Sequence, residues 1–432
     1  MPLLERIGLH RPELRAWALY DWANSVFMTT VLQVFQIYFP AVAAAGLSRS
    51  EAGSRFALAT SLSIAAVALV SPVLGALADV TGRKKPMLAL FAGMGVLATA
   101  GLYGAGRGEW LLALALFVIA NIGVVASIVF YNSLLPHIAR PEEVDRVSTA
   151  GFALGYVSGG LLLAMNGLWI QWPERFGIAS RDAAFQLSFL SAALWWGVFS
   201  LPVLLRVPEP PRDPLRGEDA ARGALGSALA RLRRTLAESR GHKDAILVLV
   251  AFLIYNDAIV TIIRLAATFG AEIGVPAPSL ILAILLVQFV GIPATFAFGQ
   301  LAGRFGTRPA IFVALVSYVG IVLFGFRMTT TAEFFVLAGL VGCVMGGAQA
   351  LSRSLFASMV PKEKSAELFG FFGVFDKFGG VFGSALFGLS LSRTGSSRPA
   401  VLAMAAFFLI GGFLLSRVDV DRGRRAVREA AA

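Results

Sequence analysis

The sequence predicts an all-α integral membrane protein whose twelve transmembrane helices form two six-helix bundles. Three observations support this fold class. The 432 residues are 57% hydrophobic and only 15% charged, whereas soluble domains carry about 25% charged residues. The apolar residues are gathered in segments of roughly 18 to 28 residues, each long enough to cross a ~30 Å hydrocarbon layer as a helix. A short charged loop in the first half recurs in the second half.

The apolar segments divide evenly between the two halves of the chain. In the first half they fall at 16–41, 56–78, 86–105, 110–135, 147–168 and 185–206. In the second half they fall at 244–268, 279–301, 309–326, 332–358, 366–390 and 399–416. Helices are expected because backbone groups in lipid must be hydrogen-bonded within their own segment. The alternating pattern of outer-membrane strands is absent from these segments.

A charged, proline-rich stretch separates the halves. It covers 207–243 and opens with four prolines between positions 208 and 214. We therefore expect an N-terminal bundle at 1–206, a cytoplasmic linker at 207–243, and a C-terminal bundle with a tail at 244–432. Leucines recur at helical spacing between 225 and 236, with arginines between them. This pattern predicts an amphipathic helix on the membrane surface or, alternatively, a solvated linker helix.

The net charge of +11 is explained by topology rather than by nucleic-acid binding. With the N-terminus in the cytoplasm, 26 of the 37 lysines and arginines fall on that side of the membrane. The positive-inside rule then places both termini in the cytoplasm, in keeping with a bacterial inner (plasma) membrane. Membrane lipids are expected partners of the basic surface, and nucleic acid is not. Cys343 is the single cysteine, so the chain cannot form an internal disulfide.

The repeated loop reads Gly75-Ala-Leu-Ala-Asp-Val-Thr-Gly-Arg-Lys-Lys85 in the first half and Gly299-Gln-Leu-Ala-Gly-Arg-Phe-Gly-Thr-Arg308 in the second. Both copies lie between apolar segments. Such a repeat indicates that the chain arose by duplication of a membrane bundle, which is typical of transporters.

The first copy resembles the signature G-x-L-A-D-x-x-G-R-[KR] of the major facilitator superfamily. Tyr20-Asp-Trp-Ala-Asn-Ser25 and Tyr255-Asn-Asp257 resemble the branch that contains the fungal vacuolar amino-acid effluxers and their bacterial relatives. The resemblance implies the major facilitator fold and amino-acid-like substrates. Gly303 replaces the acidic residue of the signature in the second copy, so only the first loop is expected to act as a charged latch.

Ionisable groups within membrane helices are functional candidates because their burial in lipid is costly. Helix geometry places them in a central layer and in a second layer nearer the cytoplasm. The predicted substrate-binding residues are Asn24, Asn121, Tyr255, Asn256, Asp257, Gln288, Gln349, Asp376 and Lys377. The predicted gating residues are Tyr20, Asp21, Asp79, Gly82, Arg83, Asn132 and Arg353.

Each charge has a structural alternative, in which it pairs with another charge and holds helices together. Asp21 and Arg353 are expected to pair at equal depth. Asp376 and Lys377 are neighbours on one helix and are expected to face different directions, so each needs another partner, a cavity or a ligand. Arg264 is expected to pair or to extend toward the outer surface.

Signatures of soluble enzymes are missing. The sequence has no Gly-Lys dipeptide for a phosphate-binding loop, and its three histidines are too dispersed for a metal site. We predict no enzyme activity, cofactor or metal, and a monomeric secondary active transporter working by alternating access. Protons are the expected coupling ion, carried by Asp257 or Asp376. The alternatives are efflux of amphipathic drugs or lipids, and a receptor or scaffold that does not transport.

Overall fold

The computed structural model describes residues 3–211, 223–237 and 243–431. Within these ranges all regular structure is helical, and no β-strand occurs. The first half contains α1 Leu3–Arg6, α2 Pro12–Val26, α3 Leu32–Tyr38, α4 Arg49–Thr81, α5 Lys84–Gly101, α6 Trp110–Ile138, α7 Val144–Gln171 and α8 Arg181–Arg206. The second half contains α10 Lys243–Glu272, α11 Ala277–Phe305, α12 Thr307–Arg327, α13 Thr331–Ala357, α14 Ser365–Phe378, α15 Val381–Thr394, α16 Arg398–Ser416 and α17 Val420–Ala431. Between the halves lies α9 Gly223–Ala237.

The described residues contain twelve helical spans long and apolar enough to cross a membrane, which confirms the predicted number. Local sequence signals set several of their ends. Ser48 and Glu51 form a reciprocal capping box at the start of α4, and Thr330 and Glu333 form another at the start of α13. Gly82 ends α4 with a left-handed φ of 66°, a conformation that favours glycine.

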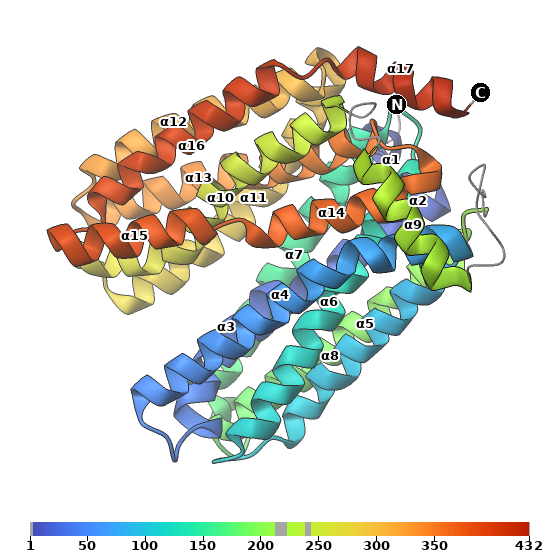
Figure 1. Ribbon diagram of the computed structural model, residues 1–432. Helices are drawn as coiled ribbons and strands as arrows, with labels where there is room; N and C mark the ends of the chain where they lie inside the picture. Colours follow the sequence, from blue (N-terminus) through green and yellow to red (C-terminus); the bar gives the residue numbers. More distant parts are fainter. Residues whose placement is uncertain (1–2, 212–222, 238–242, 432) are drawn as a thin grey trace.

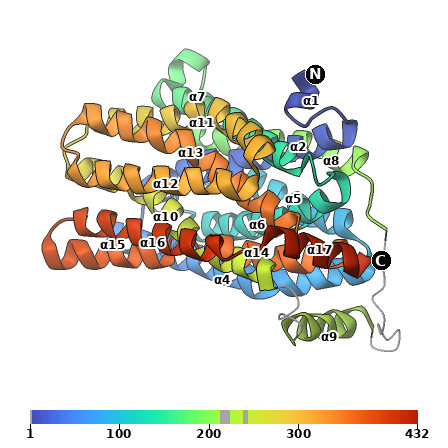
Figure 2. The same ribbon diagram turned by 90° about the horizontal axis from the view of Figure 1, so that it is seen from above.

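The spans form two bundles, one from α2–α8 and the other from α10–α16 (Figure 1). The bundles converge at the end of the molecule where α1, α9 and α17 lie, and they diverge toward the opposite end. We call the first end the terminal end and the second the distal end. The view from above shows α9 outside the bundles, at their edge (Figure 2).

The most extensive contacts between the bundles are those of α4 with α14 and of α7 with α11, and α13 and α14 also contact α7 and α6. The contact of α4 with α14 requires very close approach. A Cβ on Gly370 of α14 would lie 2.7 Å from the carbonyl oxygen of Ser71 in α4. A Cβ on Gly75 would overlap the backbone of Ala366 in the same way. Glycine at these positions therefore lets α4 and α14 pack backbone against backbone.

The structure departs from the predicted continuous segment at 366–390. This span is broken into α14 and α15, which are separated by Gly379 and Gly380. Gly380 has a φ of 85°, so the break uses a conformation that other residues rarely adopt. The first span is also irregular, with π-helical turns at Phe27–Val31 and Phe39–Ala43.

The predicted linker helix is present as α9, which packs beside α4. Of the predicted linker, the structure describes 207–211, 223–237 and 243; the rest lies outside the described residues. The face of α9 that carries Ala228 and Arg231 is buried, whereas Leu225 and Leu229 are exposed.

Candidate functional site: a charged latch and a polar network at a broken helix

Arg353 of α13 reaches from the C-terminal bundle into the N-terminal bundle. Its Nη2 donates to Asp21 Oδ2 of α2 at 2.9 Å, which is the ion pair that the sequence predicted. Nε donates to Ser148 Oγ of α7 at 2.9 Å, and Nη1 donates to Asn132 Oδ1 of α6 at 3.3 Å. Three helices of one bundle thus bind a single guanidinium of the other.

Aromatic rings surround the guanidinium of this largely buried ion pair. Arg353 is only 4% exposed, and its guanidinium carbon lies 4.8 Å from the Trp17 ring centroid and 4.5 Å from that of Phe152. Tyr20 packs behind this layer, with its ring 4.8 Å from that of Tyr131. The pair is therefore desolvated and multiply hydrogen-bonded, which are the conditions under which a buried ion pair is strongly coupled.

Asp79 forms a second connection between the bundles. Its Oδ2 accepts the backbone N–H of Glu367 at 2.9 Å, and its Oδ1 accepts that of Ala366 at 3.2 Å. Both donors belong to the first turn of α14, whose positive dipole end favours a carboxylate. The Nζ of Lys84 lies 2.9 Å from Asp79 Oδ1. We call Asp79, Lys84 and the first turn of α14 the latch.

Within the repeated loop, the cation that contacts Asp79 is Lys84 rather than Arg83. The Arg83 side chain is exposed, because Gly82 turns the chain outward before α5 begins. Lys84 is buried, and its Nζ also donates to Ser365 Oγ at 2.6 Å and lies 2.9 Å from His137 Nε2. Sequence reasoning selected Arg83 instead of Lys84, because both residues belong to the signature and the signature does not show which of them faces Asp79.

The second bundle has its own counterpart of the latch, which sequence reasoning also missed. Gly303 leaves no carboxylate in the repeated loop, but Asp145 of α7 supplies one from the facing helix. Asp145 Oδ2 accepts from Thr307 Oγ1 at 2.7 Å, and its Oδ1 accepts from Ser354 Oγ at 2.5 Å. The sequence did contain a signal for this contact, because Asp145 comes directly before the predicted span 147–168, which carries Ser148.

The linker also reaches the latch. Arg231 of α9 is 4% exposed, and its Nε lies 3.4 Å from Oε2 of Glu367. Arg231 also donates to the carbonyl of Glu363. Glu209, at the start of the linker, accepts the backbone N–H of Lys84 at 2.7 Å. Partial burial raises the pKa of the Glu209 carboxyl, although its hydrogen bonds from the backbone N–H groups of Lys84 and Lys85 act in the opposite direction.

A polar network lies beside the helix break. Gln349 Nε2 donates to Asn256 Oδ1 at 3.2 Å, and Asn256 Nδ2 donates to Asp376 Oδ1 at 3.5 Å. Lys377 Nζ lies 3.2 Å from Asp376 Oδ2, so these neighbours do pair, contrary to expectation. α14 ends at Phe378, and the long lysine chain can fold back onto the adjacent carboxylate.

Asp257 caps the second piece of the broken helix. Its Oδ1 accepts the N–H of Gly383 at 2.7 Å, and its Oδ2 accepts that of Phe382 at 3.1 Å. The side chain is 1% exposed. A Cβ on Gly380 would lie 3.3 Å from Nη1 of Arg264, so this arginine flanks the break rather than extending away from it. Asp257 therefore holds the break in shape in this conformation.

The remaining predicted binding residues lie apart from this network. Asn24 donates to the Tyr20 carbonyl of its own helix at 2.7 Å, and Asn121 donates to Ser63 Oγ at 2.7 Å within the N-terminal bundle. Tyr255 bonds to Ser352. Gln288 is buried where α11 crosses α7. These side chains serve contacts inside or between bundles, and the structure does not gather them into one site.

The two bundles of six spans have the major facilitator fold, and solved structures share this fold. The fucose:proton symporter FucP of E. coli superposes with a TM-score of 0.69 at 14% identity, covering 94% of this chain and 98% of that chain. The proton:xylose symporter XylE gives 0.67 at 16% identity, covering 99% and 98%.

Sequence comparison gives the family. The family model described as "Vacuole effluxer Atg22 like" matches residues 41–428. The uncharacterized MFS-type transporter YxiO of Bacillus subtilis is 32% identical over 410 residues, which is 94% of each chain. Autophagy-related protein 22 of Saccharomyces cerevisiae is 28% identical, covering 87% of this chain and 80% of that protein. The chain belongs to the Atg22-like family and is a multi-pass membrane transporter, not an enzyme.

Proposed function

We propose that this transporter carries a small, amino-acid-like solute by alternating access between its two bundles, driven by a proton gradient. The observation that carries the proposal is the separation of two layers along α13. Arg353 binds the opposite bundle, and Gln349, one turn away on the same helix, joins the polar network. Rearrangement at one layer is thereby transmitted to the other.

The terminal end faces the cytoplasm in this proposal. The lysines and arginines are concentrated in the loops and helices of that end, as the positive-inside rule requires. The Asp21–Arg353 pair and the latch then close the cytoplasmic side, while the bundles diverge toward the outside (Figure 1). Opening these contacts would release the solute on the cytoplasmic side or admit it from there.

The polar network favours a zwitterion as substrate. Asp376 and Lys377 are partly exposed, at 30% and 19% of their side chains, and lie opposite in charge at 3.2 Å. An ammonium group could replace Lys377 beside Asp376, and a carboxylate could replace Asp376 beside Lys377. Both charges of an amino acid would then be paired, and the Asn256 and Gln349 amides would supply further hydrogen bonds.

Proton coupling is assigned to the carboxylates of the same region. Asp376 is the accessible one, and Asp257 is buried with both oxygens bonded to backbone N–H groups. Protonation of Asp376 would free Lys377 from its partner. Protonation of Asp257 would weaken the cap of α15 and loosen the break. Either event links a proton to the shape of the site.

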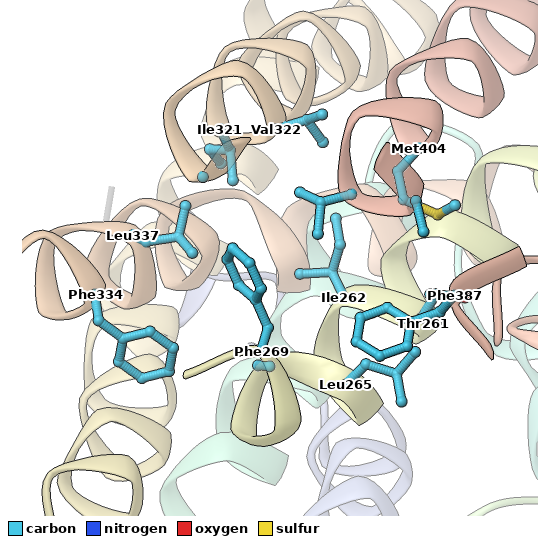
Figure 3. Close-up of a pocket in the computed structure, with 14 residues that line it drawn as sticks. Thr261, Ile262, Leu265, Phe269, Ile321, Val322, Phe334, Leu337, Phe387 and Met404 are labelled. Atoms are coloured by element: carbon cyan, nitrogen blue, oxygen red, sulfur yellow. The ribbon is translucent and has the colours of Figure 1, made fainter. Parts of the chain in front are cut away.

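A second candidate, transport of an amphipathic compound, is favoured by an apolar pocket in the C-terminal bundle (Figure 3). It lies between α10, α12, α13, α15 and α16. Phe269, Phe334 and Phe387 contribute rings to it, and Thr261 is its one hydroxyl-bearing side chain. Such a lining suits a hydrocarbon or aromatic group and offers no partner for a charge.

Thermal stabilisation of the purified protein distinguishes the two candidates. Amino acids and amphipathic compounds are tested on the wild type, on Lys377→Gln and on Val401→Phe, which fills the apolar pocket. An amino-acid substrate should stabilise the wild type and Val401→Phe but not Lys377→Gln. The second proposal would replace the first if an amphipathic compound stabilised the wild type and Lys377→Gln but no longer stabilised Val401→Phe.

A further inference from the structure

The linker helix α9 has two faces that call for two different partners. Ala228, Arg231 and Thr235 are buried against the bundles, whereas Leu225 and Leu229 are 58% and 43% exposed. At 100° per residue, the centres of these two faces are roughly 90° apart around the helix. A helix that packs one face against the protein and exposes an apolar face roughly perpendicular to it can lie on a membrane surface beside the protein.

The charge of α9 indicates the kind of surface. Its sequence, Gly-Ala-Leu-Gly-Ser-Ala-Leu-Ala-Arg-Leu-Arg-Arg-Thr-Leu-Ala, contains three arginines and no acidic residue. Arg231 is directed inward, and Arg233 and Arg234 are exposed. At 100° per residue, Arg233 lies roughly 60° from the centre of the leucine face, whereas Arg234 lies on the opposite side of the helix. Leucines that can enter the headgroup region beside an exposed arginine match anionic phospholipids, whose headgroups supply the complementary charge.

The buried face of α9 meets the latch at a cluster of charges. Asp79 and Glu367 are two buried carboxylates, and Lys84, Arg231 and Lys364 are buried cations. Lys84 pairs with Asp79, and Arg231 lies 3.4 Å from Glu367. Glu367 has 0% exposure. If α9 moved away, this carboxylate would remain buried without Arg231, which is strongly unfavourable. The position of α9 is therefore coupled to the state of the latch.

We propose that α9 binds anionic lipid headgroups through Leu225, Leu229 and Arg233, and thereby holds Arg231 in the latch, so that anionic lipid favours the state closed at the terminal end. The inference rests on the gate proposed above, and it adds a lipid that regulates this gate. A neutral bilayer lacks the attraction to Arg233, so it should leave α9 less firmly bound and the latch more often open.

The test uses the full-length protein with Cys343→Ser in nanodiscs of phosphatidylcholine, with or without phosphatidylglycerol. Two measurements are made. A fluorophore on Leu229→Cys reports whether α9 lies in lipid or water. Spin labels on Glu142→Cys and Lys362→Cys, which are exposed positions on opposite bundles at the terminal end, report whether that end is closed. The variants are Arg233→Gln and Arg231→Gln. The matched control is Arg425→Gln, which removes one exposed arginine from α17.

Phosphatidylglycerol should move the fluorophore into lipid and increase the population with the short spin-label distance. Arg233→Gln should weaken the membrane contact roughly fivefold and reduce the lipid effect on distance accordingly, while the control should keep both responses. Arg231→Gln should keep the membrane contact and lose the effect on distance. If Arg231→Gln folds poorly, Arg231→Gln/Glu367→Gln removes both charges together and tests the same coupling.

Two results would overturn the inference. A fluorophore that stays in water in phosphatidylglycerol would exclude the lipid contact. A fluorophore that enters lipid without any change in distance would exclude the coupling. Asp79→Asn, measured in the same nanodiscs, separates these results from failure of the gate itself. If Asp79→Asn increases the distance in both lipids, the gate stands and only the role of α9 is wrong.

Discussion

The carboxylate of Asp79 in the N-terminal bundle accepts the backbone N–H of Glu367 in the C-terminal bundle at 2.9 Å. The donor is in the first turn of α14, and the same helix ends at Phe378, just after the Asp376–Lys377 pair. One short helix therefore carries the latch at one end and the polar network at the other. The break at Gly379 and Gly380 separates α14, which packs mainly against α4 and α6 of the N-terminal bundle, from α15, which packs against α10 and α16.

We expect Asp79→Asn to favour opening of the terminal end. The asparagine keeps the shape of the side chain but loses the charge that binds Lys84 and one of the acceptors for the first turn of α14. Charge-assisted hydrogen bonds of this kind contribute about 2 kcal/mol, so the ratio of open to closed protein should rise roughly 30-fold.

Labelling of a cysteine at the seam between α7 and α11 measures this shift. Thr149 is 1% exposed and packs against Gly299 there. In a Cys343→Ser background, a maleimide that cannot cross the membrane should react with Thr149→Cys faster when Asp79 is replaced. Glu142→Gln, an exposed acid at the same end, serves as the control. Equal labelling rates for Asp79→Asn and wild type would show that Asp79 does not hold the closed state.

Removal of one partner from the Asp21–Arg353 pair should be worse than removal of both. Arg353→Met leaves the buried carboxylate of Asp21 unpaired, at a cost of about 3–5 kcal/mol. Asp21→Asn/Arg353→Met removes both charges and should recover part of this loss. A double-mutant cycle on thermal stability and on uptake tests the coupling. Strictly additive losses would mean that the 2.9 Å contact contributes no coupling energy.

Gly151→Ala should disrupt the same ion pair without touching either charge. A Cβ on Gly151 would lie 3.2 Å from Arg353 Nη2 and closer still to the Asp21 carboxylate. The pair must then shift or break, and we expect a loss of about 2 kcal/mol in stability. Gly167→Ala is the control on the same helix, since open space surrounds that position and alanine favours the helix. Equal melting temperatures for the two variants would contradict this steric account.

The sequence allowed the fold to be predicted because span length and the repeated loop depend on local composition. It also predicted the Asp21–Arg353 contact, since depth along a helix follows from residue number. The break at Gly380 was missed because two glycines within an apolar segment also suit close helix packing. The sequence did not reveal the roles of Lys84, Asp145 and Arg231. These roles depend on which helices lie opposite them, and periodicity gives the depth of a residue along its helix but not the helix that it faces.

Asp257→Asn separates a structural role from a role in coupling. In the structure each carboxylate oxygen accepts one N–H of α15. An asparagine has a single acceptor oxygen, and its NH₂ group would face a backbone donor. We therefore expect a loss of about 1–3 kcal/mol in stability. If Asp257 also carries the coupled proton, Asp257→Asn should keep substrate exchange while losing proton-driven accumulation. If it binds an ammonium group, affinity itself should fall.

Measurements of ligand affinity, exchange and proton-driven uptake on this one variant distinguish these roles. Asp376→Asn is the matched comparison, because Asp376 is partly exposed and pairs with Lys377. We expect Asp376→Asn to lower substrate affinity with little change in melting temperature, since its carboxylate caps no helix. A variant Asp257→Asn with wild-type affinity, exchange and accumulation but a lower melting temperature would limit Asp257 to capping α15. Binding and coupling would then be assigned to Asp376 and Lys377.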